Sequence, residues 1–271
     1  MTELILSNAE YHAHPAWSSS PVRLLPEYPE LFHGRYITGE FPHPESDAID
    51  LGTAVHSDLL EGGKGWLEIP ADALTSNGQR RGKAWEAFEA EHAGQTLLLP
   101  SQAAKVRLIS ASVLADPMAR RLLEATGKAE ESLFLPDPET ALPLKARPDK
   151  QCCFPDGLIL ADIKTVSDPG EYAFAYKCLD YGYARQAAWY SMAVQTCHLE
   201  PVEAFVFICV RSEPPYECRC WELTDRAIER GTELNRVAIN DLATRLVSDD
   251  WHGPGFGRCL PLELPNRFYQ E

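Results

Sequence analysis

The segment that most constrains the fold is a short apolar run, residues 158–164, which ends in two charged side chains. If this run is a strand, alternation places Leu160, Asp162 and Lys164 on one face and the intervening aliphatic residues on the other. An Asp and a Lys in such a strand must be solvated, paired or bound to a metal, because burying them unpaired is very costly. The run therefore predicts a buried strand with a polar site at its end.

The pattern around this run changes from helical to extended and back to helical. Helices are predicted upstream, at residues 50–61, 82–93, 101–115 and 117–126. Strands are predicted at 130–135, 142–149 and 158–164, then a helix at 183–195, strands at 202–210 and 216–223, and a helix at 224–247. This order predicts an α/β (mixed α+β) fold, in which helices flank a central mixed sheet and the N-terminal half is helical.

The 271 residues are expected to form one main domain with two appendages. Residues 1–50 are rich in Pro, His and Ser and predict an irregular N-terminal arm with one short helix. The main domain is placed at 51–250 and a C-terminal tail at 251–271. A cytoplasmic protein without membrane contact is expected, because there is no long apolar stretch and no signal-peptide pattern.

The charge balance argues against a polyanionic partner without excluding one. The chain has 25 Lys and Arg against 40 Asp and Glu, which gives a net charge of -15. Net charge averages over the whole surface, however, and a nucleic-acid enzyme needs positive potential only along its channel and carboxylates at its metals. The acidic composition therefore leaves a nuclease open.

A second carboxylate stands upstream of the polar strand, in Arg147-Pro148-Asp149, thirteen residues before Asp162. Two carboxylates from adjacent strands would form a hard oxygen site suited to Mg²⁺. Lys164 could then orient an attacking water or help to deprotonate it. Taken alone, the Asp-x-Lys triplet indicates a salt bridge near a turn, so the rest of the sequence has to decide.

The wider set of motifs resembles the RecE-type (exonuclease VIII-like) phage exonucleases of the PD-(D/E)xK nuclease superfamily. The matching segments are Gly52-Thr53-Ala54-x-His56, Arg147-Pro148-Asp149, Asp162-Ile163-Lys164-Thr165 and Gly182-Tyr183-x-x-Gln186-x-x-x-Tyr190. The likeness also includes Tyr11-His12 with Ser18 to Ser20, and the segment from Arg81 to Trp85. The resemblance covers most of the chain up to about residue 250 and implies a restriction-endonuclease-like sheet.

The resemblance implies a role for each matching residue. Asp149 and Asp162 correspond to the metal-binding carboxylates, and Lys164 corresponds to the catalytic lysine. His56 corresponds to a histidine that helps to hold the metal from a helix, for which a neutral imidazole is suited.

Two further sets of residues complete the predicted site. Gln186 and Tyr190 are four residues apart, so they share a helical face and could position the scissile phosphate or the water. An additional Glu is often present in the superfamily, and Glu130 is preferred here, with Glu131 as the alternative. Only one of the two can face the site if they lie on a strand.

The resemblance also implies the activity and the partners. The family degrades linear double-stranded DNA processively from its ends, 5′ to 3′, with Mg²⁺ (or Mn²⁺), and leaves single-stranded tails for recombination by a phage-type single-strand annealing protein. Family members form ring-shaped oligomers, so a homo-oligomer and a phage or prophage origin are expected. Arg147, Lys145, Arg81 and Lys83 are the predicted DNA contacts.

Other interpretations remain open from sequence alone. One is an iron–sulfur nuclease that uses four of the eight cysteines, although Cys218-x-Cys220 and the distant Cys259 do not form a compact ligand set. Another is a non-catalytic DNA-end-binding or phage protein-interaction module on the same fold. The acidic charge also suits a structural phage protein with a coincidental triplet.

Overall fold

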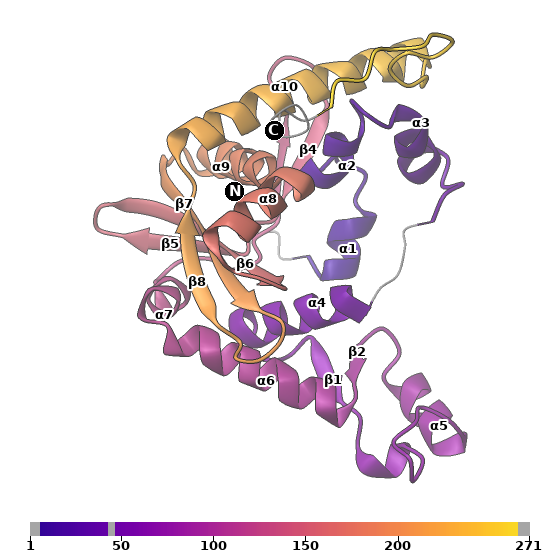
Figure 1. Cartoon of the computed structure of the whole chain (residues 1–271), viewed down its shortest axis with the longest axis vertical. Helices are drawn as coiled ribbons and strands as arrows, with labels where there is room; N and C mark the ends of the chain where they lie inside the picture. The colour runs from indigo at the N-terminus through magenta and orange to yellow at the C-terminus, as the bar shows by residue number, and fades with distance from the viewer. Residues whose placement is uncertain (1–5, 43–46, 265–271) are drawn as a thin grey trace.

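A four-stranded mixed sheet forms the centre of the computed structural model, which describes residues 6–42 and 47–264 (Figure 1). Its strands are ordered β5(Lys150–Phe154), β6(Gly157–Val166), β7(Val202–Arg211) and β8(Cys218–Glu222). β6 and β7 are parallel, whereas β5 and β8 pair antiparallel to them at the two edges. The predicted mixed α/β fold with a central sheet is confirmed.

The two central strands are apolar on both faces, and helices cover both. Leu160, Phe205 and Phe207 pack on one side, beneath α9(Tyr183–His198) and α10(Asp225–Ser248). Ile163 and Ile208 pack on the other side, against α4(Asp47–Leu60), α6(Pro100–Ala115) and α7(Pro117–Glu124). Alternation along β6 therefore sends Asp162 and Lys164 toward the α9 side, as the sequence predicts.

Several short elements were not predicted. They are the parallel pair β1(Trp66–Glu68) and β2(Thr96–Leu98), the edge strand β5, the helix α8(Glu171–Tyr181) and the 3₁₀ turn η2(Ala71–Ala73). Gly182, with φ 67°, separates α8 from α9 by a left-handed residue. The predicted helix at 82–93 is α5(Lys83–Glu91).

The predicted strand at 142–149 is shorter than expected. β3(Leu133–Pro136) and β4(Pro143–Ala146) form a hairpin, so β4 ends three residues before Asp149. Pro148 has no N–H to donate to a ladder, which is consistent with the end of the strand here. Asp149 is therefore carried by the turn into β5 rather than by a strand.

The N-terminal segment is more helical than the sequence indicated. It contains α1(Asn8–Ala13), α2(Ser19–Leu24), α3(Pro29–Phe32) and the π-helical turn η1(His33–Ile37). Ser7 and Glu10 form a capping box that begins α1. Trp17 exchanges backbone hydrogen bonds with Pro143 and Lys145, both 2.8 Å, which joins this segment to β4.

Among the described residues, no helix has the length and apolar character needed to cross a membrane.

Asp137→Asn is expected to lower the free energy of unfolding by about 2 kcal/mol, because charge-assisted hydrogen bonds are lost. The buried Asp137 accepts hydrogen bonds from Arg236 on α10 and from Thr140. Burial alone would raise the pKa of Asp137, but these donors lower it below 3.8. The stabilisation is therefore fully present above pH 3.8 and disappears as the pH falls through the folded pKa. Urea titrations of both proteins from pH 3 to pH 7 should show the difference shrinking only at the acid end.

Candidate functional site

Asp149 lies beside the middle of β6 because β5 pairs with β6 immediately after it, with Lys150 opposite Ala161. The backbone N–H of Ile163 donates a 2.7 Å hydrogen bond to Asp149 Oδ2. The side chain is nearly buried. The turn and one backbone bond thus fix the carboxylate next to the strand that carries Asp162 and Lys164.

Asp162 and Lys164 form a buried ion pair through Asp162 Oδ1. The Lys164 ammonium lies 4.7 Å from the centroid of the Tyr183 ring, a cation–π contact that fixes its position. Asp162 is fully buried, and its Oδ2 has no hydrogen-bond partner among the described residues. A buried carboxylate oxygen without a donor is costly unless a cation reaches it.

His56 approaches Asp149 from α4, which packs on the face of the sheet opposite to α9. Its Nε2 lies 2.8 Å from the carbonyl oxygen of Ile163. Since a carbonyl only accepts, Nε2 must carry the proton. Nδ1 then points at Asp149 Oδ2, 3.3 Å away, and at Glu130 Oε1, 3.9 Å away. In its neutral form His56 therefore presents the Nδ1 lone pair to the carboxylates, as a metal ligand would.

Glu130 and Glu131 point to different places because the backbone turns between them. Glu130 has φ 51°, a left-handed conformation that is rare for this residue type, and its N–H donates to the carbonyl of Asp149. Glu131 is bound instead by Lys128, Gln151 and His198, at 2.6–2.8 Å. Glu130 faces the carboxylate cluster and Glu131 faces away from it.

Three of the four predicted metal ligands are brought together. The ligand atoms of His56, Glu130 and Asp149 lie within 4.8 Å of one another, and in the described part of the chain no other three His, Cys, Asp or Glu side chains do so. Asp162 is not in this group, although it lies close enough for its charge to raise the pKa of His56. In the described part of the chain, no group of three or more cysteines has the geometry of a metal site.

The pKa values of the cluster are shifted by burial and by the mutual proximity of its charges. Burial and the neighbouring Asp149 raise the pKa of Asp162 to about 6, and burial also raises the pKa of Asp149. Burial would lower the pKa of His56, but Asp149 and Glu130 outweigh it and raise the value to about 9. Three carboxylates gathered around one imidazole, with the Lys164 ammonium beside them, are a donor set that fits a divalent metal.

Gln186 and Tyr190 share one face of α9, as the sequence predicts, and Gln186 Nε2 donates a 3.1 Å hydrogen bond to Tyr190 Oη. Burial raises the pKa of Tyr190, and the charges of Asp162 and Asp149 raise it further. The phenol is therefore protonated and lies near the two carboxylates. It is placed to donate a hydrogen bond into the site.

The structure gives Lys145 and Arg147 a role other than the predicted DNA contact. Lys145 is buried, and its ammonium donates to the carbonyls of Tyr11, His12 and His14 at 2.7–3.3 Å. Arg147 is also buried and donates to the carbonyl of Leu6 and to Ser132. Because these donors are engaged by α1 and its flanks, the two side chains hold the N-terminal segment against β4, although Arg147 also lines a cleft beside Glu130.

Arg81 and Lys83 are exposed at the beginning of α5, which lies apart from the sheet (Figure 1).

Two tyrosines near the site were not predicted from the sequence. Tyr183 supports Lys164, and Tyr11 packs under Arg147, 4.2 Å from the guanidinium to the ring centroid. Both belong to the motifs that carried the resemblance, but nothing in their spacing indicates contact with a cation.

A protein-family model matches most of the chain. A model described as a PDDEXK-like domain of unknown function, DUF3799, matches residues 34–251. The chain belongs to this PDDEXK-like family. Among curated proteins, none matches. The fold, the PD-(D/E)xK part of the resemblance and a nuclease-type architecture are thereby confirmed.

Two solved structures are similar to the chain to different degrees. A crystal structure of a protein from Eubacterium rectale, to which an exonuclease function is ascribed, is 13% identical, with 98% of each chain covered and a TM-score of 0.60. An alkaline exonuclease from Laribacter hongkongensis is 14% identical, with 71% of this chain and 95% of that chain covered and a TM-score of 0.32. The first of these likenesses extends the shared fold over nearly the whole chain.

Proposed function

We propose that this PDDEXK-like chain is a divalent-metal-dependent exodeoxyribonuclease that degrades linear double-stranded DNA from its ends. The observation that supports it most is the convergence of His56, Glu130 and Asp149 beside the buried pair of Asp162 and Lys164. A binding module has no need of an anionic cluster next to a buried lysine. Mg²⁺ is the expected ion, with Mn²⁺ as an alternative.

His56, Glu130, Asp149 and Asp162 would hold the metal. When bound, a divalent ion activates water and stabilises charge on the attacking and leaving oxygens of a phosphodiester. Burial alone would lower the pKa of Lys164, but the ion pair with Asp162 and the nearby charge of Asp149 raise it, so this residue acts as an ammonium. It can orient the water and stabilise negative charge on the phosphate. Gln186 and Tyr190 supply hydrogen-bond donors on the adjacent face.

We take a cleft of about 520 Å³, which Glu130 lines together with Lys128 and Arg147, as the access to this site. Arg81 and Lys83 remain proposed DNA contacts at a distance from the chemistry. By resemblance, we further propose 5′ to 3′ polarity, single-stranded tails for a phage-type annealing protein, recombination as the role and a ring-shaped homo-oligomer.

The test is incubation of linear and closed-circular duplex DNA with the purified protein, with Mg²⁺ or with EDTA, beside Lys164→Ala. Loss of the linear DNA alone, only with Mg²⁺ and only with the unchanged protein, is the expected result. Intact linear DNA would instead favour a non-catalytic module.

Glu130→Gln and Glu131→Gln form a matched pair of variants. Glu130→Gln is expected to lower the rate of metal-dependent cleavage by about 10- to 100-fold, since it removes a charge that faces the metal. Glu131→Gln is expected to leave the rate within about twofold but to lower stability by about 1 kcal/mol, since its partners are structural. Initial rates and thermal melting of both variants check this, and the reverse order would make Glu131 the ligand.

A further inference from the structure

A second cleft, of about 540 Å³, begins where β6 continues past Lys164. Thr165 and Ser167 line it from β6 and the turn that follows, and Tyr183 lines it from the start of α9. Tyr183 is also the ring against which Lys164 packs, so this cleft adjoins the catalytic lysine. We call it the Thr165 cleft.

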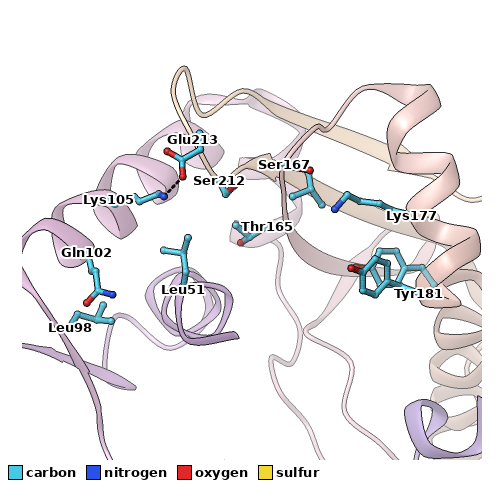
Figure 2. Close-up of a pocket in the computed structure, with 12 residues that line it drawn as sticks. Leu51, Leu98, Gln102, Lys105, Thr165, Ser167, Lys177, Tyr181, Ser212 and Glu213 are labelled. Carbon is cyan, nitrogen blue, oxygen red and sulfur yellow. Dashed lines mark hydrogen bonds and ion pairs between the residues drawn. The ribbon is translucent and has the colours of Figure 1, made fainter. Parts of the chain in front are cut away.

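Basic and aromatic side chains face one another across the Thr165 cleft (Figure 2). Lys105 reaches in from α6, and Lys177 and Tyr181 reach in from α8, with Thr165 between them. Two lysines accompany a single acidic residue, Glu213, although the whole chain carries a net charge of -15. The lining of this cleft therefore carries an excess of one positive charge, against the overall trend of the protein.

The cleft also contains a hydroxyl group that the fold does not use. Thr165 Oγ1 is buried and has no hydrogen-bond partner in the described part of the chain. Ser167 and Ser212 add two more hydroxyls, and the backbone that carries them is tied together by the 2.7 Å bond from Ser212 N to the carbonyl of Val166. Preorganised hydroxyl donors beside lysines are typical of a phosphate site.

Glu213 forms an ion pair with the Lys105 ammonium, the group that would bind a phosphate. Lys105 Nζ lies 2.5 Å from Glu213 Oε1, as the dashed line in Figure 2 marks. The Glu213 side chain is 68% exposed, whereas that of Lys105 is 27% exposed. An ion pair with one so exposed partner is worth little, so an incoming phosphate can replace the carboxylate at low cost.

Tyr181 makes a nucleotide a better fit than a simple anion. The residue is 57% exposed, and its ring stacks on Tyr183, with centroids 5.7 Å apart and an interplanar angle of 23°. Tyrosines that are held in place and partly open to solvent provide surfaces on which nucleobases stack.

We propose that the Thr165 cleft binds the nucleotide that lies next to the scissile phosphate in the DNA strand, with its phosphate on Lys105 and Thr165 and its base on Tyr181. Glu213 holds Lys105 until DNA displaces it. This assignment rests on the proposed function, because it takes the substrate to be DNA and places it relative to Lys164.

The test measures the affinity of a short fluorescent duplex by anisotropy, with Mg²⁺ and in a Lys164→Ala background that keeps the DNA intact. Lys105→Ala and Tyr181→Ala are each expected to weaken binding by about tenfold. Lys105→Ala should also reduce the salt dependence by about one phosphate contact. Glu213→Gln should tighten binding by about threefold, and this gain should vanish when Lys105→Ala is added.

Thr165→Val separates binding from folding. It keeps the shape of the side chain and removes only the unpartnered hydroxyl, so the melting temperature should not fall while DNA affinity does. The matched controls are Arg230→Ala and Glu233→Gln, from an exposed ion pair of 2.7 Å on α10 that does not line the cleft. Both should leave affinity unchanged.

Cleavage of linear DNA by the corresponding variants with Lys164 intact distinguishes the two proposals. If the wild-type protein degrades DNA but the cleft variants bind like the controls, or Glu213→Gln weakens binding, the cleft assignment is overturned and the nuclease proposal stands. If the wild-type protein neither binds nor degrades DNA, both are overturned.

Discussion

Asp149→Asn is expected to reduce metal-dependent cleavage of linear DNA by about 10³-fold, the scale of a removed catalytic group. Asn has the same shape, and its oxygen can still accept the hydrogen bond from Ile163 N. The charge is what disappears, and with it the interaction of Asp149 with His56 Nδ1, now 3.3 Å away. The loss would therefore report on metal binding rather than on folding.

Single-turnover rates at increasing Mg²⁺ check this prediction, because a weakened site should recover part of its rate at high metal concentration. Circular dichroism and thermal melting of Asp149→Asn supply the control for folding. A variant that melts like the wild-type protein and still cleaves at more than a tenth of its rate would contradict the assigned role.

Gly127→Ala is expected to lower the free energy of unfolding by about 3 kcal/mol or more. Gly127 has φ 143°, and a Cβ there would lie 1.9 Å from the carbonyl oxygen of Gln151. The loop cannot simply move away, because Gln151 N donates to the carbonyl of Lys128 and Cys153 N donates to that of Thr126, both at 2.7 Å. Urea denaturation of the variant measures the cost.

Gly94→Ala is the matched control. Gly94 also has a positive φ, 87°, but a Cβ there meets nothing within 4 Å. Gly94→Ala should lower the free energy of unfolding only by the backbone strain, about 1 kcal/mol. Equal losses for the two variants would mean that the close approach of Gly127 to β5 is not important.

Because the Gly127 loop leads directly to Glu130, we also expect Gly127→Ala to impair cleavage.

The parts of the fold that follow from local periodicity could be predicted from the sequence. β6 and β7 have the expected bounds within a few residues, and Asp162 and Lys164 lie on the same face because alternation in a strand leaves no choice. Gln186 and Tyr190 likewise share a helical face. By contrast, β5 lacks the β-branched residues that usually indicate a strand, and its place is determined by pairing with β6.

The parts that depend on distant contacts could not be predicted. Lys145 and Arg147 are cations in a polar stretch of sequence, and only the return of α1 to β4 makes them buried hydrogen-bond donors. The choice between Glu130 and Glu131 depends on a positive φ that no side chain in that stretch signals. α8 was missed because much of it is exposed, including Tyr172 at 74% and Leu179 at 75%.

The hydrogen bond between His56 and the carbonyl of Ile163 joins α4 to β6, two elements whose bonded residues are 107 positions apart in the sequence. The proposed ligands thus come from two distant parts of the chain. Strand β6 and the loops beside it contribute the carboxylates and the lysine, and α4 in the helical N-terminal half contributes the imidazole. Neither part carries the whole site. An insertion, fusion or truncation that altered the docking of α4 is therefore expected to inactivate the protein while leaving every carboxylate in place.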